Sequence, residues 1–271
     1  MWSFIFVISL LIDIINIPYD NGANTIGSRY AYKELKNDLD FLPISNEYII
    51  NINDHLRNIF GRGFFKVCNS LNFKNFPLCI GGDHTIAISS IYAANEHCLF
   101  NKKKLGVLWF DAHADFNTML TTPSFNLHGM VVSILCGHDI YSLSYGNPLK
   151  PSQFGYYGVR DIDDLEFDRF EKYNMLLLNN EKELDKWIEK YDYIHLSFDM
   201  DCLDPDDFSG VNTKVKNGPS LENINKMLDR IRISNKLISM DIVEYNPKIE
   251  KNNSVIVNIL NKVFDKDDLL L

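Results

Sequence analysis

The residues whose types and spacing could do chemistry lie in the segment Gly106–Thr118, which reads GVLWFDAHADFNT. Four consecutive apolar residues at 107–110 predict a buried strand, and Asp111, His113 and Asp115 follow it directly. In an extended chain, side chains at positions i, i+2 and i+4 share one face. Two carboxylates and an imidazole therefore converge where this strand ends, a combination that suits a divalent cation.

Two other predicted strands end in side chains of the same kind. The apolar segment 76–80 leads into Gly-Gly-Asp-His, so that His84 lies in a strand-to-helix turn where glycines let the backbone approach a ligand closely. The segment 193–198 ends at Asp199 and Asp201. Alone, either aspartate could simply cap a helix. Together, six such residues from three strand ends favour one composite site.

Four carboxylates in one pocket repel one another, since each like-charged contact at about 4 Å costs roughly 4 kcal/mol at an effective dielectric constant near 20. Either several of them are protonated or cations lie between them. Six ligands are too many for one tetrahedral zinc ion, whereas two ions with bridging carboxylates suit them. The oxygen-rich set favours a harder ion such as Mn²⁺ over Zn²⁺. Paired ions roughly 3.5–4 Å apart can hold a bridging hydroxide as a nucleophile.

Strand and helix patterns alternate along the chain, which predicts an α/β fold with parallel strands and helices on both faces of the sheet. The predicted strands are 12–17, 48–52, 76–80, 107–110, 154–159, 175–178, 193–198 and 237–242. The predicted helices are 28–39, 55–71, 85–95, 130–136, 165–173, 181–190, 221–233 and 254–264. In such sheets ligands bind beyond the carboxyl ends of the strands, which is where every polar cluster of this chain falls.

The composition limits the class of protein. A chain of 271 residues that is 46% hydrophobic can bury a large core, and it predicts one domain over residues 1–271. The net charge of −9 disfavours nucleic acid or an anionic membrane as a partner. It suits a small cationic substrate, or it only aids solubility. Five scattered cysteines without a CxxC motif favour reduced thiols and a cytoplasmic location.

The first residues allow two interpretations. The apolar stretch 2–17 could be a signal peptide, but no Lys or Arg precedes it and Asp13 interrupts it. It is also short for a membrane span. We therefore predict a buried first strand.

Four segments, GGDHT, DAHADFN, SFDMDCLDP and MDIVEYNP, resemble the signature blocks of the ureohydrolase family, and DAHADFNTMLTTPSFNLHG resembles the arginases within it. The resemblance extends from about Pro18 to Pro247. It implies a three-layer α/β/α sandwich around a parallel sheet. It also implies hydrolysis of L-arginine to L-ornithine and urea by a hydroxide that bridges two Mn²⁺ ions in each subunit.

The resemblance further implies a role for each site residue. The ligands of the first Mn²⁺ would be His84, Asp111, Asp115 and Asp199, and those of the second would be Asp111, His113, Asp199 and Asp201. Asp115 would also orient the hydroxide, His128 would transfer a proton to the leaving amine, and Glu244 would hold the guanidinium group. The residues that would contact the rest of the substrate are Asn117 and Ser124 at the α-carboxylate, Asp163 and more weakly Glu166 at the α-amino group, and Thr213.

The sequence departs from the arginase pattern around Thr213. Arginases usually carry Gly-Thr-Pro and then a pair of glycines here, whereas this chain reads Asn212-Thr213-Lys214 and then Asn217-Gly218. We expect no counterpart of the tail that helps some arginases form trimers, so a homo-oligomer stays open. Another ureohydrolase, such as an agmatinase or a guanidino-acid hydrolase, is an alternative. So is a non-catalytic relative that binds a metal or a partner, and Asn117 and Ser124 could be ordinary turn residues.

Overall fold

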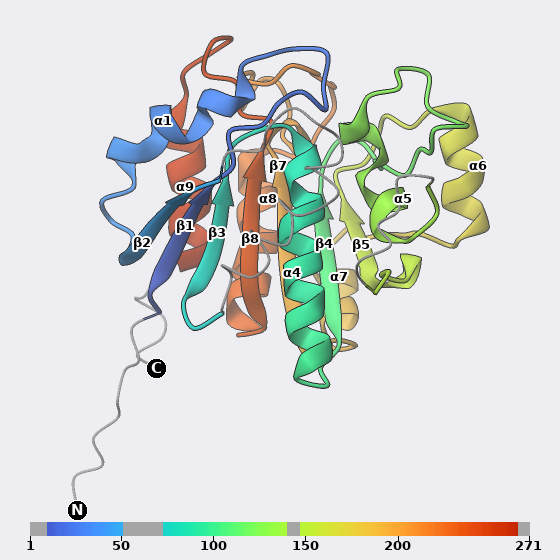
Figure 1. The fold of residues 1–271 in the computed structure, drawn as a ribbon, viewed down its shortest axis with the longest axis horizontal. Helices are drawn as coiled ribbons and strands as arrows, with labels where there is room; N and C mark the ends of the chain where they lie inside the picture. Colours follow the sequence, from blue (N-terminus) through green and yellow to red (C-terminus); the bar gives the residue numbers. More distant parts are fainter. Residues whose placement is uncertain (1–9, 51–72, 140–146, 265–271) are drawn as a thin grey trace, which may run out of the picture.

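The computed structural model describes residues 10–50, 73–139 and 147–264, in which eight parallel strands form one sheet (Figure 1). The strands are β1 (Ile12–Asn16), β2 (Ile44–Ile49), β3 (Phe76–Ile80), β4 (Leu105–Phe110), β5 (Phe154–Tyr157), β6 (Leu176–Leu177), β7 (Tyr193–Asp199) and β8 (Leu237–Val243). Their order across the sheet is β2-β1-β3-β8-β7-β4-β5-β6. The predicted α/β class with a parallel sheet is therefore confirmed.

Helices cover both faces of this sheet. The helices are α1 (Ala31–Leu35), α4 (Ala87–Phe100), α5 (Val131–Leu135), α6 (Asp164–Lys172), α7 (Glu181–Ile188), α8 (Leu221–Ile233) and α9 (Asn253–Phe264). One apolar core lies between the sheet and α1, α7, α8 and α9, and a second lies between the sheet and α4, α5 and α6. Figure 1 shows α4 and α5 in front of the sheet and α8 and α9 behind it, which is the expected three-layer sandwich.

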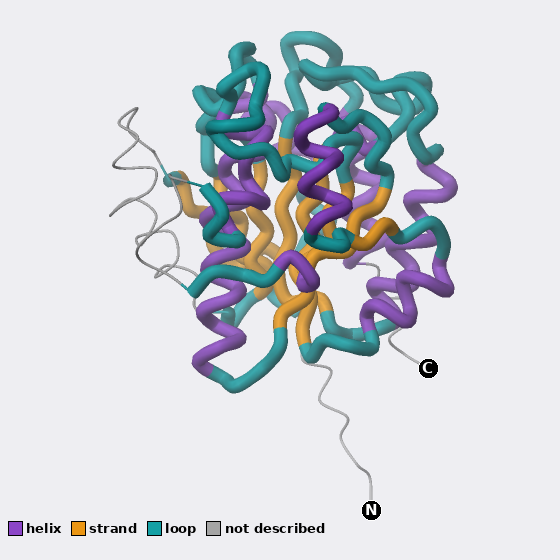
Figure 2. The backbone as a smooth tube through the Cα atoms, turned by 90° about the vertical axis from the view of Figure 1, so that its right-hand side faces the viewer, coloured by secondary structure: helices purple, strands orange, loops and turns teal. Residues whose placement is uncertain are grey.

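Strand β4 shows how the sequence produces this arrangement. All six of its residues are buried, as a parallel strand covered on both faces requires. Its side chains alternate between the two cores, with Leu108 and Phe110 in one and Val107 and Trp109 in the other. Because all strands run in the same direction, their carboxyl ends meet at one edge, where Figure 2 shows the loops gathered above the strands.

Several elements differ from the prediction. The segment predicted as one helix, 28–39, consists of two 3₁₀ turns with α1 between them. Strand β2 begins at Ile44, not at Tyr48, because it pairs with β1 from Ile12 onward. The predicted helix 55–71 lies outside the described residues.

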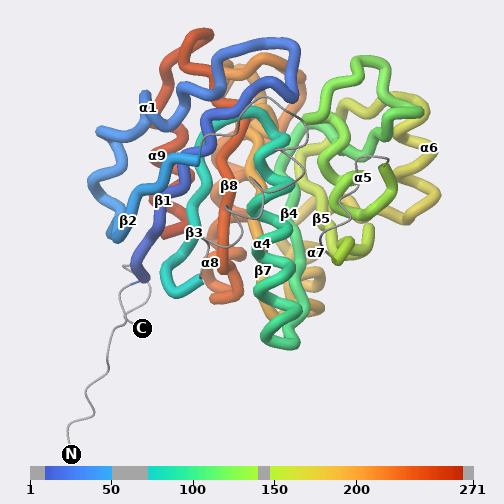
Figure 3. Tube along the Cα trace, in the orientation of Figure 1, coloured from blue at the N-terminus to red at the C-terminus, as the bar shows by residue number. Residues whose placement is uncertain are grey.

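The two ends of the described chain lie side by side. Figure 3 shows α9 next to β1 and α1, and the Lys251 ammonium and the Asn253 amide both bond to Glu34. The first strand is buried as predicted from Ile12 onward, whereas residues 2–9 lie outside the described part. Whether all 271 residues form one domain stays a prediction.

The described cysteines Cys79, Cys98, Cys136 and Cys202 are buried, and no disulfide joins them to one another. Cys68 lies outside the described residues. Within the described ranges, no helix has the length and apolar character that a membrane crossing needs.

Candidate metal centre and active site

The candidate metal ligands come from the carboxyl ends of three strands. His84 opens a short 3₁₀ turn after β3, Asp111 follows β4, and Asp199 ends β7. Strands β4 and β7 are neighbours with Phe110 opposite Phe198. Asp111 and Asp199 therefore leave the sheet side by side.

Local hydrogen bonds orient the carboxylates. The backbone N–H of His113 donates to Asp111 Oδ1 at 2.7 Å, and that of Asp201 donates to Asp199 Oδ1 at 2.8 Å. Asp201 Oδ1 accepts the Ala112 N–H at 3.0 Å, which joins the β4 turn to the β7 turn. Each of these aspartates binds the backbone through one oxygen, so the other oxygen faces its neighbours.

One group of candidate ligands surrounds His84. Its Nδ1 lies 2.9 Å from Asp111 Oδ2, 3.1 Å from Asp199 Oδ2 and 3.3 Å from Asp115 Oδ2. The other ring nitrogen, Nε2, lies 2.9 Å from the Ser197 hydroxyl, and the Trp109 ring stacks on the imidazole with centroids 4.0 Å apart. The ring is therefore held with Nδ1 directed at the carboxylates, the way outer partners fix a ligating histidine.

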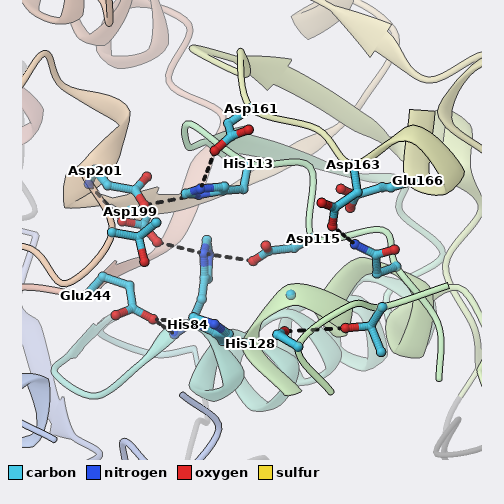
Figure 4. A pocket seen from close by; sticks show the side chains of 15 residues that line it. His84, His113, Asp115, His128, Asp161, Asp163, Glu166, Asp199, Asp201 and Glu244 are labelled. Atoms are coloured by element: carbon cyan, nitrogen blue, oxygen red, sulfur yellow. Dashed lines mark hydrogen bonds and ion pairs between the residues drawn. The ribbon is translucent and has the colours of Figure 1, made fainter. Parts of the chain in front are cut away.

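A second group surrounds His113. Its Nδ1 lies 3.1 Å from Asp201 Oδ2 and 3.3 Å from Asp111 Oδ1, and its Nε2 lies 3.8 Å from Asp161 Oδ2. Asp111 belongs to both groups, in each of which the ligand atoms lie within 4.8 Å of one another. Figure 4 shows His84, His113 and Asp115 turned toward the same space as Asp199 and Asp201. The six predicted ligands are therefore brought together.

The donor atoms at the centre of this cluster fit a cation. His84 Nδ1 and Asp111 Oδ2 are 2.9 Å apart, but neither atom forms a hydrogen bond of normal geometry with any of the described residues. Buried polar atoms without partners are costly in a folded protein. A divalent ion between the imidazole and the carboxylates would satisfy both atoms.

The charges of the cluster support the same conclusion. Burial and the charge of Asp111 raise the pKa of Asp115 well above its usual value, and burial with the charges of Asp201 and Asp111 does the same for Asp199. Burial alone would lower the pKa of His84, but Asp111 and Asp199 raise it well above its usual value. Without a cation, these groups therefore favour bound protons, which a metal would replace.

Glu244 and His128 lie beside the cluster. Glu244 Oε1 accepts the backbone N–H of His84 at 2.9 Å and lies 3.1 Å from His128 Nδ1. Burial would lower the pKa of His128, but the hydrogen bond and charge of Glu244 raise it to about 9. This shift of the pKa favours the protonated imidazole, which can donate a proton.

A pocket of about 140 Å³ opens over these groups. The residues that line it are His84, His113, Asp115, Asn117, Thr122, Ser124, His128, Gly129, Asp161, Asp163, Glu166, Asp199, Asp201, Thr213 and Glu244. All predicted site residues line it except Asp111, which is fully buried behind it. Sequence reasoning missed Thr122, Gly129 and Asp161. Seven of the lining side chains are carboxylic acids and none is a lysine or an arginine, so the pocket favours a cationic ligand.

Comparison with known proteins identifies the family. The model of the arginase family matches residues 12–264. The chain belongs to the arginase family. It is therefore an enzyme of the ureohydrolase type, which acts on a guanidino C–N bond.

Individual arginases resemble this chain over most of its length. The arginase of Staphylococcus aureus strain COL is 34% identical over 221 residues, which are 76% of this chain and 69% of the relative. The arginase of Bacillus subtilis strain 168 is 32% identical over 238 residues, 80% of this chain and 78% of the relative. The crystal structure of Entamoeba histolytica arginase in complex with L-ornithine is 27% identical, with a TM-score of 0.85 over 95% of this chain and 99% of that chain.

In this arginase-family chain, two residues predicted to contact the substrate carboxylate also bind neighbouring protein groups. Asn117 Nδ2 donates to Asp163 Oδ2 at 3.0 Å, and Ser124 Oγ accepts the Asn126 N–H at 3.2 Å in an ordinary turn contact. Figure 4 shows Asp163 and Glu166 on the far side of Asp115 from the metal cluster.

Glu166 and Thr213 differ in how firmly they are held. Glu166 is buried, and its Oε1 accepts the Phe116 N–H at 2.6 Å, so it supports the loop after β4. Burial raises its pKa to about 7. Thr213 is exposed at the rim of the pocket. The roles of all these residues toward substrate stay predictions.

Proposed function

We propose that this chain is an arginase, which hydrolyses L-arginine to L-ornithine and urea with two Mn²⁺ ions in each subunit. The observation that carries the proposal is the pair of His/Asp groups that share Asp111 at one side of an acidic pocket. The arginases to which the chain is similar support it, one of them crystallised with L-ornithine. A homo-oligomer and a cytoplasmic location stay predictions.

The donor set favours manganese. Four carboxylates and two imidazoles offer more oxygen than nitrogen ligands, and carboxylates suit Mn²⁺ well. The ligands of the first ion would be His84, Asp111, Asp115 and Asp199, and those of the second would be Asp111, His113, Asp199 and Asp201. When bound, the two ions would supply a hydroxide nucleophile at neutral pH.

Glu244 and His128 act on the guanidinium end of the substrate. Both described hydrogen bonds of the Glu244 carboxylate end on Oε1, so Oε2 is left to accept a guanidinium N–H. The protonated His128 imidazole, held by Glu244, would donate its proton to the amine that leaves as ornithine.

The opposite side of the pocket would bind the amino-acid end. Asn117 and Ser124 can donate hydrogen bonds to the α-carboxylate, whereas Asp163 and more weakly Glu166 would accept them from the α-amino group. Agmatine has no α-carboxylate, so it would leave Asn117 and Ser124 without a ligand. We therefore expect L-arginine to be preferred.

Urea release from L-arginine and from agmatine, with and without Mn²⁺, tests the proposal. We expect urea from L-arginine only, loss of activity after treatment with EDTA, and recovery with Mn²⁺. Equal or better turnover of agmatine would reject the arginase assignment in favour of another ureohydrolase. Asp201→Ala should abolish urea release, and Asp168→Ala, at an exposed position on α6, is its control. Unchanged urea production by Asp201→Ala would rule out a two-metal reaction.

A further inference from the structure

Arg160 follows β5, and among the described residues it is the only arginine whose side chain donates a hydrogen bond to the backbone carbonyl of a predicted metal ligand, Asp201. Its guanidinium donates only to backbone carbonyl oxygens, at distances of 2.7–3.2 Å. The six acceptors are the carbonyls of Gly158, Asp201, Cys202, Leu203, Val215 and Lys216. A guanidinium has five N–H donors in a rigid fork, and all three of its nitrogens are engaged here.

These acceptors belong to three segments that build the pocket. The turn 200–203 contains Asp201, which faces His113 in the second candidate metal group. The loop 212–217 contains Thr213 at the rim of the pocket. The third segment is the end of β5, and there the backbone N–H of Arg160 donates to Ala112 O at 2.9 Å. One side chain thus joins the metal end of the pocket to the divergent loop around Thr213.

Gly218 allows the loop to lie against this guanidinium. A Cβ built at Gly218 would lie 2.7 Å from Arg160 Nη2 and 2.8 Å from the carbonyl carbon of Leu203. Any side chain at this position would therefore push the loop away from Arg160 or displace the guanidinium. Gly218 N also donates to Asp204 Oδ2 at 3.0 Å, which fixes the end of the loop.

We propose that Arg160 is a positioning residue that holds the Asp201 turn and the Thr213 loop in a fixed relation to each other. We call these contacts of the Arg160 guanidinium the Arg160 clamp. Its consequence for metal and substrate binding rests on the proposed function. A lysine could not replace it, because an ammonium carries its three donors on one atom and cannot reach all three segments.

Two variants weaken the Arg160 clamp in different ways. Arg160→Lys removes the guanidinium group, whereas Gly218→Ala keeps the guanidinium group but prevents the loop 212–217 from lying against it. The matched control is Arg230→Lys on α8, because the Arg230 guanidinium binds the Asp185 carboxylate at 2.7 and 2.9 Å on the surface. Thermal melting in EDTA compares these three variants with the unmodified protein. It shows whether a variant has lost its fold as a whole, as distinct from losing only the local contact.

Hydrogen exchange of the metal-free proteins measures the clamp without any assumption about function. We expect peptides from residues 199–217 to exchange about tenfold faster or more in Arg160→Lys and Gly218→Ala, and to be unchanged in Arg230→Lys. In calorimetric titrations with Mn²⁺, one of two sites should weaken by about 10–100-fold. At saturating Mn²⁺, the KM for L-arginine should rise about tenfold while kcat changes by less than about threefold.

The outcomes separate the two proposals. Exchange in 199–217 that matches the unmodified protein in both Arg160→Lys and Gly218→Ala would overturn the clamp. So would faster exchange accompanied by unchanged Mn²⁺ affinity and unchanged KM, because Arg160 would then stiffen the loops without positioning the site. If the unmodified protein released no urea, the proposed function would fail, and the exchange comparison would still decide whether the clamp exists.

Discussion

Replacement of Asp115 by asparagine tests whether the buried cluster is built for cations. Asp115 is buried, and its Oδ2 lies 3.3 Å from His84 Nδ1, the nitrogen that Asp111 Oδ2 approaches to 2.9 Å. Asparagine has nearly the same shape as aspartate and tolerates the left-handed backbone of this position, where φ is 47°. The substitution therefore removes the ionisable carboxyl group and changes little else.

The size of the effect follows from the geometry. Because both oxygens approach the same nitrogen, they are at most about 6 Å apart, where like charges repel by about 3 kcal/mol at an effective dielectric constant of about 20. In the metal-free protein, either this repulsion or the binding of the proton that removes it makes folding less favourable. Asp115→Asn should remove it and stabilise the metal-free protein by about 1–3 kcal/mol, which raises the melting temperature by about 2–12 °C.

Mn²⁺ should reverse the order of stability. A ligand present at about 100 times its Kd stabilises a folded protein by about 2.7 kcal/mol. The unmodified protein should gain this from Mn²⁺, whereas the variant lacks one carboxylate ligand and should gain much less. Thermal melting in EDTA and in a series of Mn²⁺ concentrations measures both effects, with Asp168→Asn on α6 as the control. A variant that melts below the unmodified protein in EDTA, or that keeps the full Mn²⁺ shift, would refute the reasoning.

Three further substitutions probe other parts of the site. His128→Asn should lower kcat about 10²–10⁴-fold with little change in KM, because it removes the proposed proton donor; full activity in urea assays would contradict that role. Ser197→Ala should weaken Mn²⁺ binding about 10–100-fold in calorimetry, because the hydroxyl holds His84 Nε2, whereas Ser234→Ala should not. Burial raises the pKa of Glu166 from 4.5 to about 7, so this group makes the fold less stable as pH rises through that range. Glu166→Gln should remove that loss, and an unchanged slope of melting temperature against pH would contradict it.

The sequence predicted the metal-ligand cluster because simple geometry controls it. Side chains at alternate positions share a face, and the carboxyl ends of parallel strands meet at one edge of the sheet. Asp161 was missed although the same rule applies, since it lies two residues before Asp163 in the segment that follows β5. Thr122 had no such signal, because it lies in the irregular loop after β4, where its hydrogen bonds stay within residues 118–125 and no strand or helix period applies.

The fold was predicted best where strands are buried on both faces. β2 was misplaced because it is an edge strand with a mostly exposed, polar sequence, ISNEYI, and so lacks an apolar run. The segment 28–39 was predicted as one helix from its composition. In the structure Asp20 Oδ2 accepts the backbone N–H groups of Gly27 and Arg29, at 2.7 and 3.2 Å, which ties the start of this segment to the preceding turn. That contact comes from a residue outside the segment 28–39, so the helical pattern of the segment itself does not reveal it.

Two backbone conformations at the site show that its residues are not the ones that would give the most stable fold. Asp115 and Glu244 have φ values of 47° and 62°, in the left-handed region that glycine adopts most easily. For other residues this conformation costs roughly 1–2 kcal/mol. Glycine would relieve that strain at either position, but it would also remove the carboxylate that the bent backbone turns toward His84 and His128. The residues with a strained backbone and buried like charges are thus among those proposed to bind metal and substrate. Folding alone does not compensate this loss of stability, and we expect bound metal and substrate to offset it.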